Sequence, residues 1–200
     1  MKIVFISGVK FGFDLLDELE NVKKSFGVEV DIHAYGDRLV VHHNAFSDGV
    51  DLQTWLSVCG NRFVIFNIKE EGIESLVCDM AIEAGIKDFF LLDLSFPALI
   101  KISLKGESRV AIRVSEYESI NKALLLQSKI EWVWLDCFNG FPLVAKEAEQ
   151  LNNSPLKVCI VSPELHGGSR SENDIYQFKE KISLFKLRVD AVCTKFPEAW

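Results

Sequence analysis

Short runs of apolar, β-branched and aromatic residues recur along the whole chain and alternate with segments of helical periodicity. Eight such runs begin about 21 to 35 residues apart, the repeat of a strand–loop–helix–loop unit. They occupy residues 3–6, 28–32, 63–66, 89–92, 110–114, 132–135, 158–161 and 189–193. Between them, residues 13–19, 72–84, 142–151 and 174–187 place apolar side chains at i, i+3 and i+4. The pattern predicts eight strands separated by amphipathic helices.

Continuous apolar strands that alternate with amphipathic helices are typical of a parallel sheet covered by helices. Eight units predict a compact (β/α)8 TIM barrel with a parallel eight-stranded sheet, built as a single domain over residues 1–200. Residues 39–43 add a short extra strand after strand two. An open doubly wound sheet is the structural alternative. Residues 7–12 match neither a phosphate-binding loop nor a dinucleotide-binding fingerprint.

Composition narrows the class of protein and its partners. The apolar share of 48% is ample for a large core, and the net charge of −7 argues against nucleic acid as a partner. Five scattered cysteines without a Cys-x-x-Cys pair favour reduced, buried thiols. No apolar run approaches the length of a membrane span, and residues 1–6 match a first strand better than a signal peptide. We therefore expect a cytoplasmic protein without a membrane span.

A strand with acidic residues on one face is the most informative local pattern. Side chains alternate between the two faces of a strand, so residues 28–33 place Glu29, Asp31 and His33 together, opposite three apolar residues. Two acids and an imidazole are costly to bury unless they are paired or bound to a metal. Two adjacent histidines, at positions 42 and 43, follow about ten residues later. We interpret this segment as the centre of a functional site.

Polar side chains also stand at the carboxyl ends of the predicted strands, where barrels of this kind carry their chemistry. These positions are Ser7, Asp31, His33, Asn67, Lys69, Asp93, Arg113, Asp136, Ser162, Glu164, His166, Thr194 and Lys195. For any single position, a loop start that is merely polar is the alternative. Carboxylates with an amide suit Mg²⁺ or Ca²⁺, histidine transfers protons near neutral pH, and lysine binds a phosphate oxygen. Together they predict metal-assisted hydrolysis of a phosphate ester.

Several of these segments resemble the glycerophosphodiester phosphodiesterase family, within the phosphatidylinositol-phospholipase-C-like barrel superfamily. The family's Glu-x-Asp-Val and Val-Val-x-His-Asp patterns are similar to residues 29–32, Glu-Val-Asp-Ile, and to residues 40–44, Val-Val-His-His-Asn. Its Glu-Ile-Lys strand resembles residues 67–69, Asn-Ile-Lys, and its C-terminal Asp-Gly…Thr-Asp-x-Pro signature resembles residues 190–197. The resemblance implies a TIM barrel in which two histidines act as acid and base around one divalent metal.

The resemblance also implies roles for individual residues. Glu29 and Asp31 would hold Mg²⁺ or Ca²⁺ as metal ligands, assisted by Asn67. His43 matches the family's second catalytic histidine and would act as general acid or base, while Lys69 would bind the phosphate. These five residues form the predicted metal-binding and catalytic set.

The chain departs from the family at two places. Residues 7–10, Ser-Gly-Val-Lys, lack the His-Arg-Gly motif that supplies the first catalytic histidine and a phosphate-binding arginine, and Asn67 replaces a metal-binding glutamate. His33 and His166 are the candidates to replace the lost histidine, and with Glu164 they form the predicted substrate-binding set. Loss of a general acid or base commonly lowers the rate by about 10²–10⁴-fold.

Two functions follow from this incomplete set. The first is a diverged, glycerophosphodiester-phosphodiesterase-like hydrolase that acts on a small phosphodiester. The alternative is a catalytically inactive barrel that binds a phosphorylated sugar or lipid head group. In both, the expected partner is a small phosphorylated ligand. A lyase or isomerase that uses the barrel's acids without phosphate is a third hypothesis, because one fold hosts many chemistries. Trp132 and Trp134 share a strand face, and we expect both to pack under helices.

Overall fold

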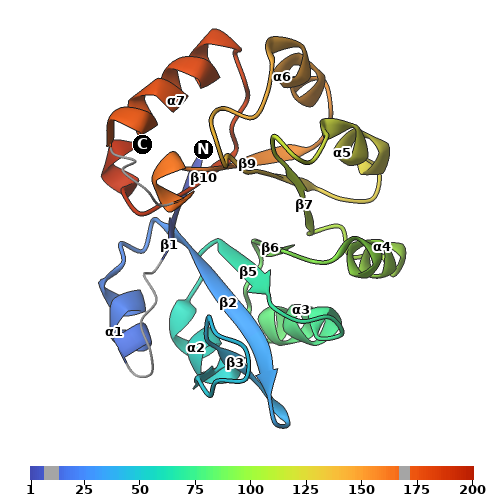
Figure 1. The fold of residues 1–200 in the computed structure, drawn as a ribbon. Helices are drawn as coiled ribbons and strands as arrows, with labels where there is room; N and C mark the ends of the chain where they lie inside the picture. The colour runs from blue at the N-terminus through green and yellow to red at the C-terminus, as the bar shows by residue number, and fades with distance from the viewer. Residues whose placement is uncertain (7–13, 167–171) are drawn as a thin grey trace.

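A computed structural model describes residues 1–6, 14–166 and 172–200. Strands occupy the centre of the molecule and helices lie around them (Figure 1). The strands are β1 (Lys2–Ile6), β2 (Gly27–Tyr35), β3 (Arg38–Val41), β4 (Val50–Asp51), β5 (Val64–Ile68), β6 (Phe89–Leu92), β7 (Ala111–Val114), β8 (Trp132–Leu135), β9 (Lys157–Val161) and β10 (Ala191–Thr194). The helices are α1 (Asp14–Asn21), α2 (Leu52–Cys59), α3 (Glu74–Glu83), α4 (Phe96–Leu104), α5 (Ile120–Leu126), α6 (Ala145–Asn152) and α7 (Glu172–Leu184), with short 3₁₀ helices η1 (Pro163–His166) and η2 (Pro197–Ala199).

Parallel pairing dominates the sheet. Seven parallel ladders join neighbouring strands in the order β6-β5-β2-β1-β10-β9-β8-β7. Each of the eight predicted apolar runs overlaps one of these strands. The two ends of the order, β6 and β7, meet through one parallel bridge between Leu91 and Val110 rather than through a ladder. The α/β class is as predicted, whereas closure of the barrel at this seam is not shown.

Two antiparallel strands, β3 and β4, make the sheet mixed; the sequence predicted an extra strand at β3, without its direction, and did not predict β4. The predicted extra strand forms as β3, which pairs with the second half of β2, and β4 pairs with β3. The tight turn between β2 and β3 contains Gly36 at a φ of 66°, a left-handed conformation that glycine adopts without steric cost. This hairpin extends β2 beyond the neighbouring strands and positions the segment that follows β3.

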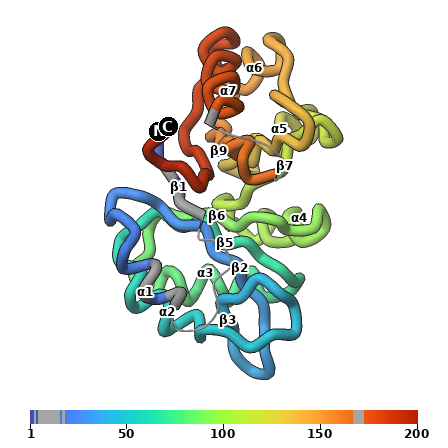
Figure 2. The backbone as a smooth tube through the Cα atoms, turned by 60° about the vertical axis from the view of Figure 1, so that its left-hand side comes forward, coloured from blue at the N-terminus to red at the C-terminus, as the bar shows by residue number. Residues whose placement is uncertain are grey.

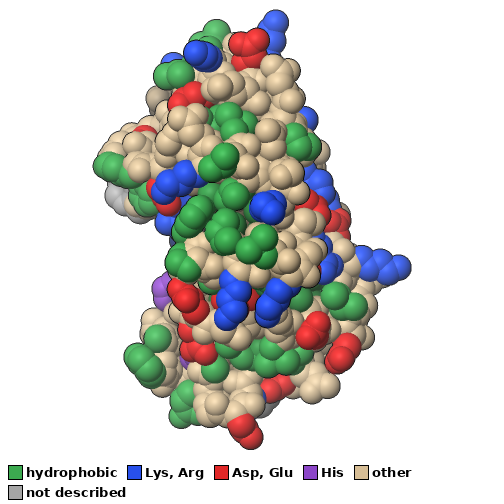
Figure 3. Space-filling view, turned by 90° about the vertical axis from the view of Figure 1, so that its right-hand side faces the viewer, with side chains coloured by type: hydrophobic (Ala, Val, Ile, Leu, Met, Phe, Trp, Pro, Cys, Tyr) green, Lys and Arg blue, Asp and Glu red, His purple; other side chains and the backbone are tan. Residues whose placement is uncertain are grey.

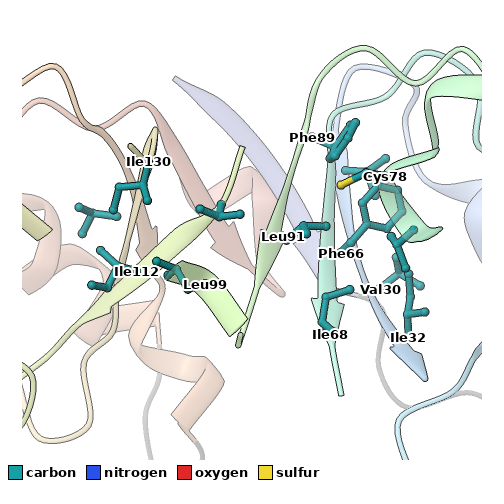
Figure 4. Packing of buried hydrophobic residues seen from close by; sticks show 14 of the residues in the cluster. Val30, Ile32, Phe66, Ile68, Cys78, Phe89, Leu91, Leu99, Ile112 and Ile130 are labelled. Atoms are coloured by element: carbon teal, nitrogen blue, oxygen red, sulfur yellow. The ribbon is translucent and has the colours of Figure 1, made fainter. Parts of the chain in front are cut away.

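Two apolar layers lie on opposite faces of the strands. The outer layer packs against helices: Val30, Ile32 and Phe66 project toward Cys78 of α3 (Figure 4). The inner layer contains Phe63, Phe90, Trp132 and Trp134 together with small residues such as Ala111 and Cys193. The prediction that the two tryptophans pack under helices was therefore wrong. Because β8 is apolar on both faces, its alternation alone did not distinguish inside from outside.

The helices follow from periodicity and capping. The four predicted helical segments overlap α1, α3, α6 and α7, whereas α2, α4 and α5 were not predicted. Asp51 caps α2 by accepting bonds from the backbone N–H groups of Gln53 and Thr54, and Ser95 caps α4 through the N–H of Ala98. These capping side chains are the local signals that identify two of the three missed helices, α2 and α4.

Surface and thiol features agree with the composition. All five cysteines are buried thiols. On the face over α4 and α5, exposed apolar side chains are interspersed with Lys and Arg (Figure 3), and the exposed ones include Leu104 and Leu125. The first and last residues lie close together (Figure 2), because η2 packs against β1. Within the described ranges, no helix has both the length and the apolar character needed to span a bilayer.

Candidate functional site

The inward-facing positions at the carboxyl ends of β2 and β5 bring the predicted metal-binding residues together. Asp31 of β2 stands opposite Asn67 of β5 in the parallel register. Asn67 Nδ2 donates a 2.9 Å hydrogen bond to Glu29 Oε1. Outward neighbours on the same strands belong to the outer apolar layer. Alternation along the strand thus places these polar groups inside, as the sequence predicted.

Asp31 contacts two basic side chains at once. Its Oδ1 lies 2.8 Å from Lys69 Nζ, and its Oδ2 lies 2.7 Å from His43 Nδ1. A backbone bond fixes Lys69, whose N–H donates to the carbonyl of Ile32, and another fixes the residue before His43, because the N–H of His42 donates to the carbonyl of Asp31. Asp31 is largely buried, whereas the His43 ring is about half exposed at 52%. The predicted catalytic pair therefore converges on one carboxylate, with an imidazole open to solvent.

Glu29 lies deeper, in surroundings that favour its protonated form. Burial, with the negative charges of Asp31 and Asp93 added to it, raises the pKa of Glu29 from 4.5 to about 8, although the Asn67 hydrogen bond and Lys69 act in the opposite direction. Asp93, which follows β6, is one of the negative charges that act on Glu29. A cation at this point would relieve the repulsion among the three acids.

Stability is expected to depend on pH through Glu29. Between pH 4.5 and about 8 the folded protein retains the Glu29 proton that the unfolded chain has released, so rising pH lowers the free energy of unfolding over this window. The loss amounts to a few kcal/mol, at about 1.4 kcal/mol per pKa unit. Glu29→Gln stays neutral and should remove this loss. Urea unfolding at pH 5 and pH 8 without divalent cations tests this, and identical pH dependence in both proteins would contradict it.

The structure does not bring His33 to the same place. It follows Asp31 on the same strand face, but it pairs with Val40 in the hairpin and its side chain is buried. Its Nδ1 lies 2.8 Å from the carbonyl oxygen of Ala34, and its ring meets the His42 ring edge-on at 6.2 Å. Alternation predicted the correct face but not the depth, because β2 continues beyond the neighbouring strands.

Both carboxylate oxygens of Glu164 are engaged by the protein itself. Oε1 accepts bonds from Thr194 Oγ1 at 2.6 Å and from the backbone N–H of Lys195 at 3.0 Å, and Oε2 accepts one from Ser162 Oγ. Ser162 Oγ also accepts a 2.8 Å bond from Trp200 Nε1. Glu164 thus joins the ends of β9 and β10. In this arrangement Glu164 has a structural role. To contact a substrate, as predicted, it would have to give up one of these hydrogen bonds.

A second charged group lies at the ends of β6 to β9. Arg113 Nη2 pairs with Asp93, and Arg113 Nε lies 3.5 Å from Asp136 Oδ2. Asp136 Oδ1 lies 2.5 Å from His166 Nε2, a close ionic contact without hydrogen-bond alignment. Sequence reasoning recognised three of these residues only as polar strand ends and did not predict that they form one chain of contacts. Whether these residues meet depends on the register between separate strands, and no local sequence pattern indicates that register.

The donors available to a metal are oxygen atoms. Within the ranges that the structure describes, no group of three or more His, Cys, Asp or Glu is arranged to hold a metal ion. Glu29 and Asp31 supply two carboxylates, and Asn67 Oδ1 is a buried oxygen without a hydrogen-bond partner. Carboxylate and amide oxygens are the donors that Mg²⁺ and Ca²⁺ accept. Residues 7–10, the stretch that corresponds to the family's His-Arg-Gly motif and lacks its histidine and arginine, lie outside the described residues.

Comparisons with known proteins bear on the fold. No protein-family model and no curated protein matches the chain. Among solved structures, a glycerophosphodiester phosphodiesterase from Agrobacterium tumefaciens is 13% identical with a TM-score of 0.66, covering 100% of this chain and 98% of that one. A putative glycerophosphodiester phosphodiesterase from Galdieria sulphuraria is 14% identical with a TM-score of 0.68, covering 99% and 95%.

A third similar structure is an Oleispira antarctica phosphodiesterase in complex with the product sn-glycerol-3-phosphate. It is 14% identical with a TM-score of 0.66, and the match covers 99% of this chain and 94% of that one. Nearly the full length of each chain is therefore aligned, at identities that bear on architecture alone. The chain accordingly has the fold of the glycerophosphodiester phosphodiesterases.

Proposed function

We propose that this protein hydrolyses a small phosphodiester at the carboxyl ends of strands β2, β5 and β6. The observation that carries the proposal is the position of Asp31, whose two oxygens hold Lys69 at 2.8 Å and His43 at 2.7 Å. A lysine beside an orientable imidazole combines a phosphate-binding cation with a proton-transfer group. Such a pair at strand ends supplies groups that hydrolysis of a phosphate ester can use.

Each residue of the cluster then has a defined role. Lys69 Nζ binds a non-bridging phosphate oxygen. Asp31 orients the His43 ring through Nδ1, which leaves Nε2 to accept a proton. Glu29, Asp31 and Asn67 are the residues that would hold Mg²⁺ or Ca²⁺. When bound, the divalent cation supplies positive charge to the phosphoryl oxygens.

The substrate class is proposed from size and from the solved structures. The Oleispira antarctica phosphodiesterase is in complex with its product, sn-glycerol-3-phosphate. We propose a ligand of similar size, with a phosphate and a short polyol or head group, for this chain. Among the predicted substrate-binding residues, Glu164 acts by holding the ends of β9 and β10 together, and His33 supports the hairpin that carries His43.

The alternative is a binding protein without turnover. The sequence at residues 7–10 lacks the family's His-Arg-Gly motif, which favours this alternative. Such a protein would hold a phosphorylated sugar or lipid head group on Lys69. A cytoplasmic setting remains our prediction for either function.

An assay of the purified protein with a chromogenic phosphodiester and Mg²⁺, Ca²⁺ or Mn²⁺ distinguishes the hydrolase from the binding protein. We expect steady hydrolysis that depends on Asp31 and on His43. Thermal stabilisation by glycerol phosphate without turnover would instead support the binding protein. If the protein shows neither hydrolysis nor stabilisation, both proposed functions are contradicted.

The metal proposal has its own test in Asn67→Asp. A third carboxylate beside Glu29 and Asp31 should raise Ca²⁺ affinity by about 10-fold or more, because affinity follows ligand charge. Without metal the same change should lower the melting temperature, since it adds a charge and removes the bond to Glu29. Asn61→Asp adds the same charge at an exposed position and is the matched control. Titration calorimetry with Ca²⁺ reads out the affinity, and equal affinity in all three proteins would contradict the assignment.

A further inference from the structure

Three charged or ionisable side chains at the ends of β7, β8 and β9 play no part in the mechanism proposed for the cluster around Asp31. They are Arg113, Asp136 and His166. Asp136 is buried and lies at the centre of this group, between Arg113 Nε at 3.5 Å and His166 Nε2 at 2.5 Å. Its Oδ1 also accepts a 3.0 Å bond from the backbone N–H of Cys137. The backbone therefore holds the carboxylate, which lies against the His166 imidazole in a close contact that is not aligned as a hydrogen bond.

The His166 ring is held from a second side. The ring of Phe138 lies against it, with 5.0 Å between the ring centroids. Glu116 holds the segment that carries Phe138, because its carboxylate accepts bonds from three consecutive backbone N–H groups at residues 138–140. Burial alone would raise the pKa of Glu116, but these bonds keep it below its usual value. The His166 ring is thus confined between Asp136 and Phe138, and neighbouring side chains hold proton-transfer groups in this way.

Arg113 connects the group around Asp136 and His166 to the cluster around Asp31. Its Nη2 pairs with Asp93, and Asp93 also acts electrostatically on Glu29. Asp93 has a φ of 61°, a left-handed conformation that costs energy in a non-glycine residue and that often marks functional sites. Two of the guanidinium nitrogens face carboxylates, and Nη1 has no ion-pair partner within the part of the chain that the structure describes. One end of the guanidinium is thus available to an anion.

Two separate cavities have Asp93 in their lining. A cavity of about 270 Å³ is lined by Lys69 and Asp93, among others. A second cavity, of about 380 Å³, is lined by Asp93 and Arg113 and lies at the seam where β6 and β7 share only one bridge. Asp93 thus lies between a cavity that Lys69 lines and a cavity that Arg113 lines.

We propose that His166 is the second proton-transfer residue of this site, that Asp136 positions it, and that Arg113 binds the phosphate from the side opposite Lys69. This rests on the proposed phosphodiester hydrolysis. A water oxygen bonds to phosphorus while the bond from phosphorus to the leaving alcohol oxygen breaks. His43 Nε2 takes the proton of the water, and the His166 imidazolium gives a proton to the departing oxygen. The products are an alcohol and a phosphomonoester, and proton exchange with solvent restores both rings.

The test compares two leaving groups in His166→Gln. A p-nitrophenolate leaves without protonation, whereas an alkoxide needs a proton from an acid. We expect His166→Gln to lower hydrolysis of a glycerophosphodiester with an alkyl leaving group by at least about 10²-fold. Hydrolysis of the p-nitrophenyl ester should fall by less than about 5-fold. The second substrate also reports whether the variant is folded, so the difference between the two rates carries the result.

Asp136→Asn should give a smaller loss with the same dependence on leaving group, which a purely structural residue would not give. Equal losses on both substrates, at an unchanged melting temperature, would overturn the role of His166. If His166→Gln does not fold, His166→Asn keeps an amide near the position of Nδ1 and is assayed in the same way. A wild-type protein that hydrolyses neither substrate would overturn the proposed function as well. An active wild type with equal losses in the variants would overturn this inference alone.

Discussion

Replacing Asp31 with asparagine should lower the rate of phosphodiester hydrolysis by about 10²–10⁴-fold. The carboxylate holds Lys69 Nζ and His43 Nδ1 on its two oxygens, and an amide can accept on only one of them. His43 would lose the bond that orients its ring and selects its tautomer. The same change removes one of the two carboxylates proposed to hold a divalent cation.

The folded state should tolerate this change. Asp31 raises the pKa of Glu29 by repulsion, so its neutralisation relieves part of the unfavourable charge in the cluster. That relief opposes the loss of the ion pair with Lys69, and we expect the melting temperature to change little. An activity loss without a stability loss is typical of a group that acts on the substrate.

Asp48→Asn is the matched control for Asp31→Asn. Asp48 follows the same hairpin and also forms an ion pair, with Arg38, but it is exposed. An exposed pair contributes little to stability, and its loss should leave hydrolysis within about 2-fold of the wild type. Steady-state kinetics on the three proteins decide the matter. Full activity in Asp31→Asn would exclude this cluster as the reacting centre.

Sequence periodicity predicted the site's inward face for a physical reason. Strands alternate with a period of two, so the shared parity of Glu29 and Asp31 followed from their positions alone. The same rule applied to β8 would have placed Trp132 and Trp134 inside, because they share parity with Asp136 at the strand end. Alternation indicates which residues share a face, and a charged residue at the strand end shows which face is the inner one.

What periodicity could not predict depends on contacts between elements. The pairing of Asp31 with Lys69 requires the register of β2 against β5, and the pairing with His43 requires the hairpin that brings residue 43 back to β2. His33 has the right parity but lies too far along the strand. The contact between Asp136 and His166 joins two segments about 30 residues apart, and no local pattern indicates it.

The inner apolar layer packs beneath the inward-facing polar residues of the site, and Phe90 lies at the centre of this layer. Its ring lies 5.8 Å from that of Phe63, 4.8 Å from that of Trp132 and 6.3 Å from that of Trp134. Phe90 has no solvent exposure. Aromatic rings packed at these distances gain both burial and favourable edge contacts.

Phe90→Ala should therefore lower the free energy of unfolding by about 3–5 kcal/mol, through the lost burial and the cavity left behind. The large neighbouring rings cannot collapse into the space without leaving their own contacts, so we expect the upper part of this range. Phe46→Ala removes the same ring from a side chain that is 95% exposed, and it should change stability by less than about 0.5 kcal/mol. Urea unfolding followed by circular dichroism compares the two. A cost below about 1 kcal/mol for Phe90→Ala would mean that the interior of the strands is not the packed layer on which the inward-facing acids depend.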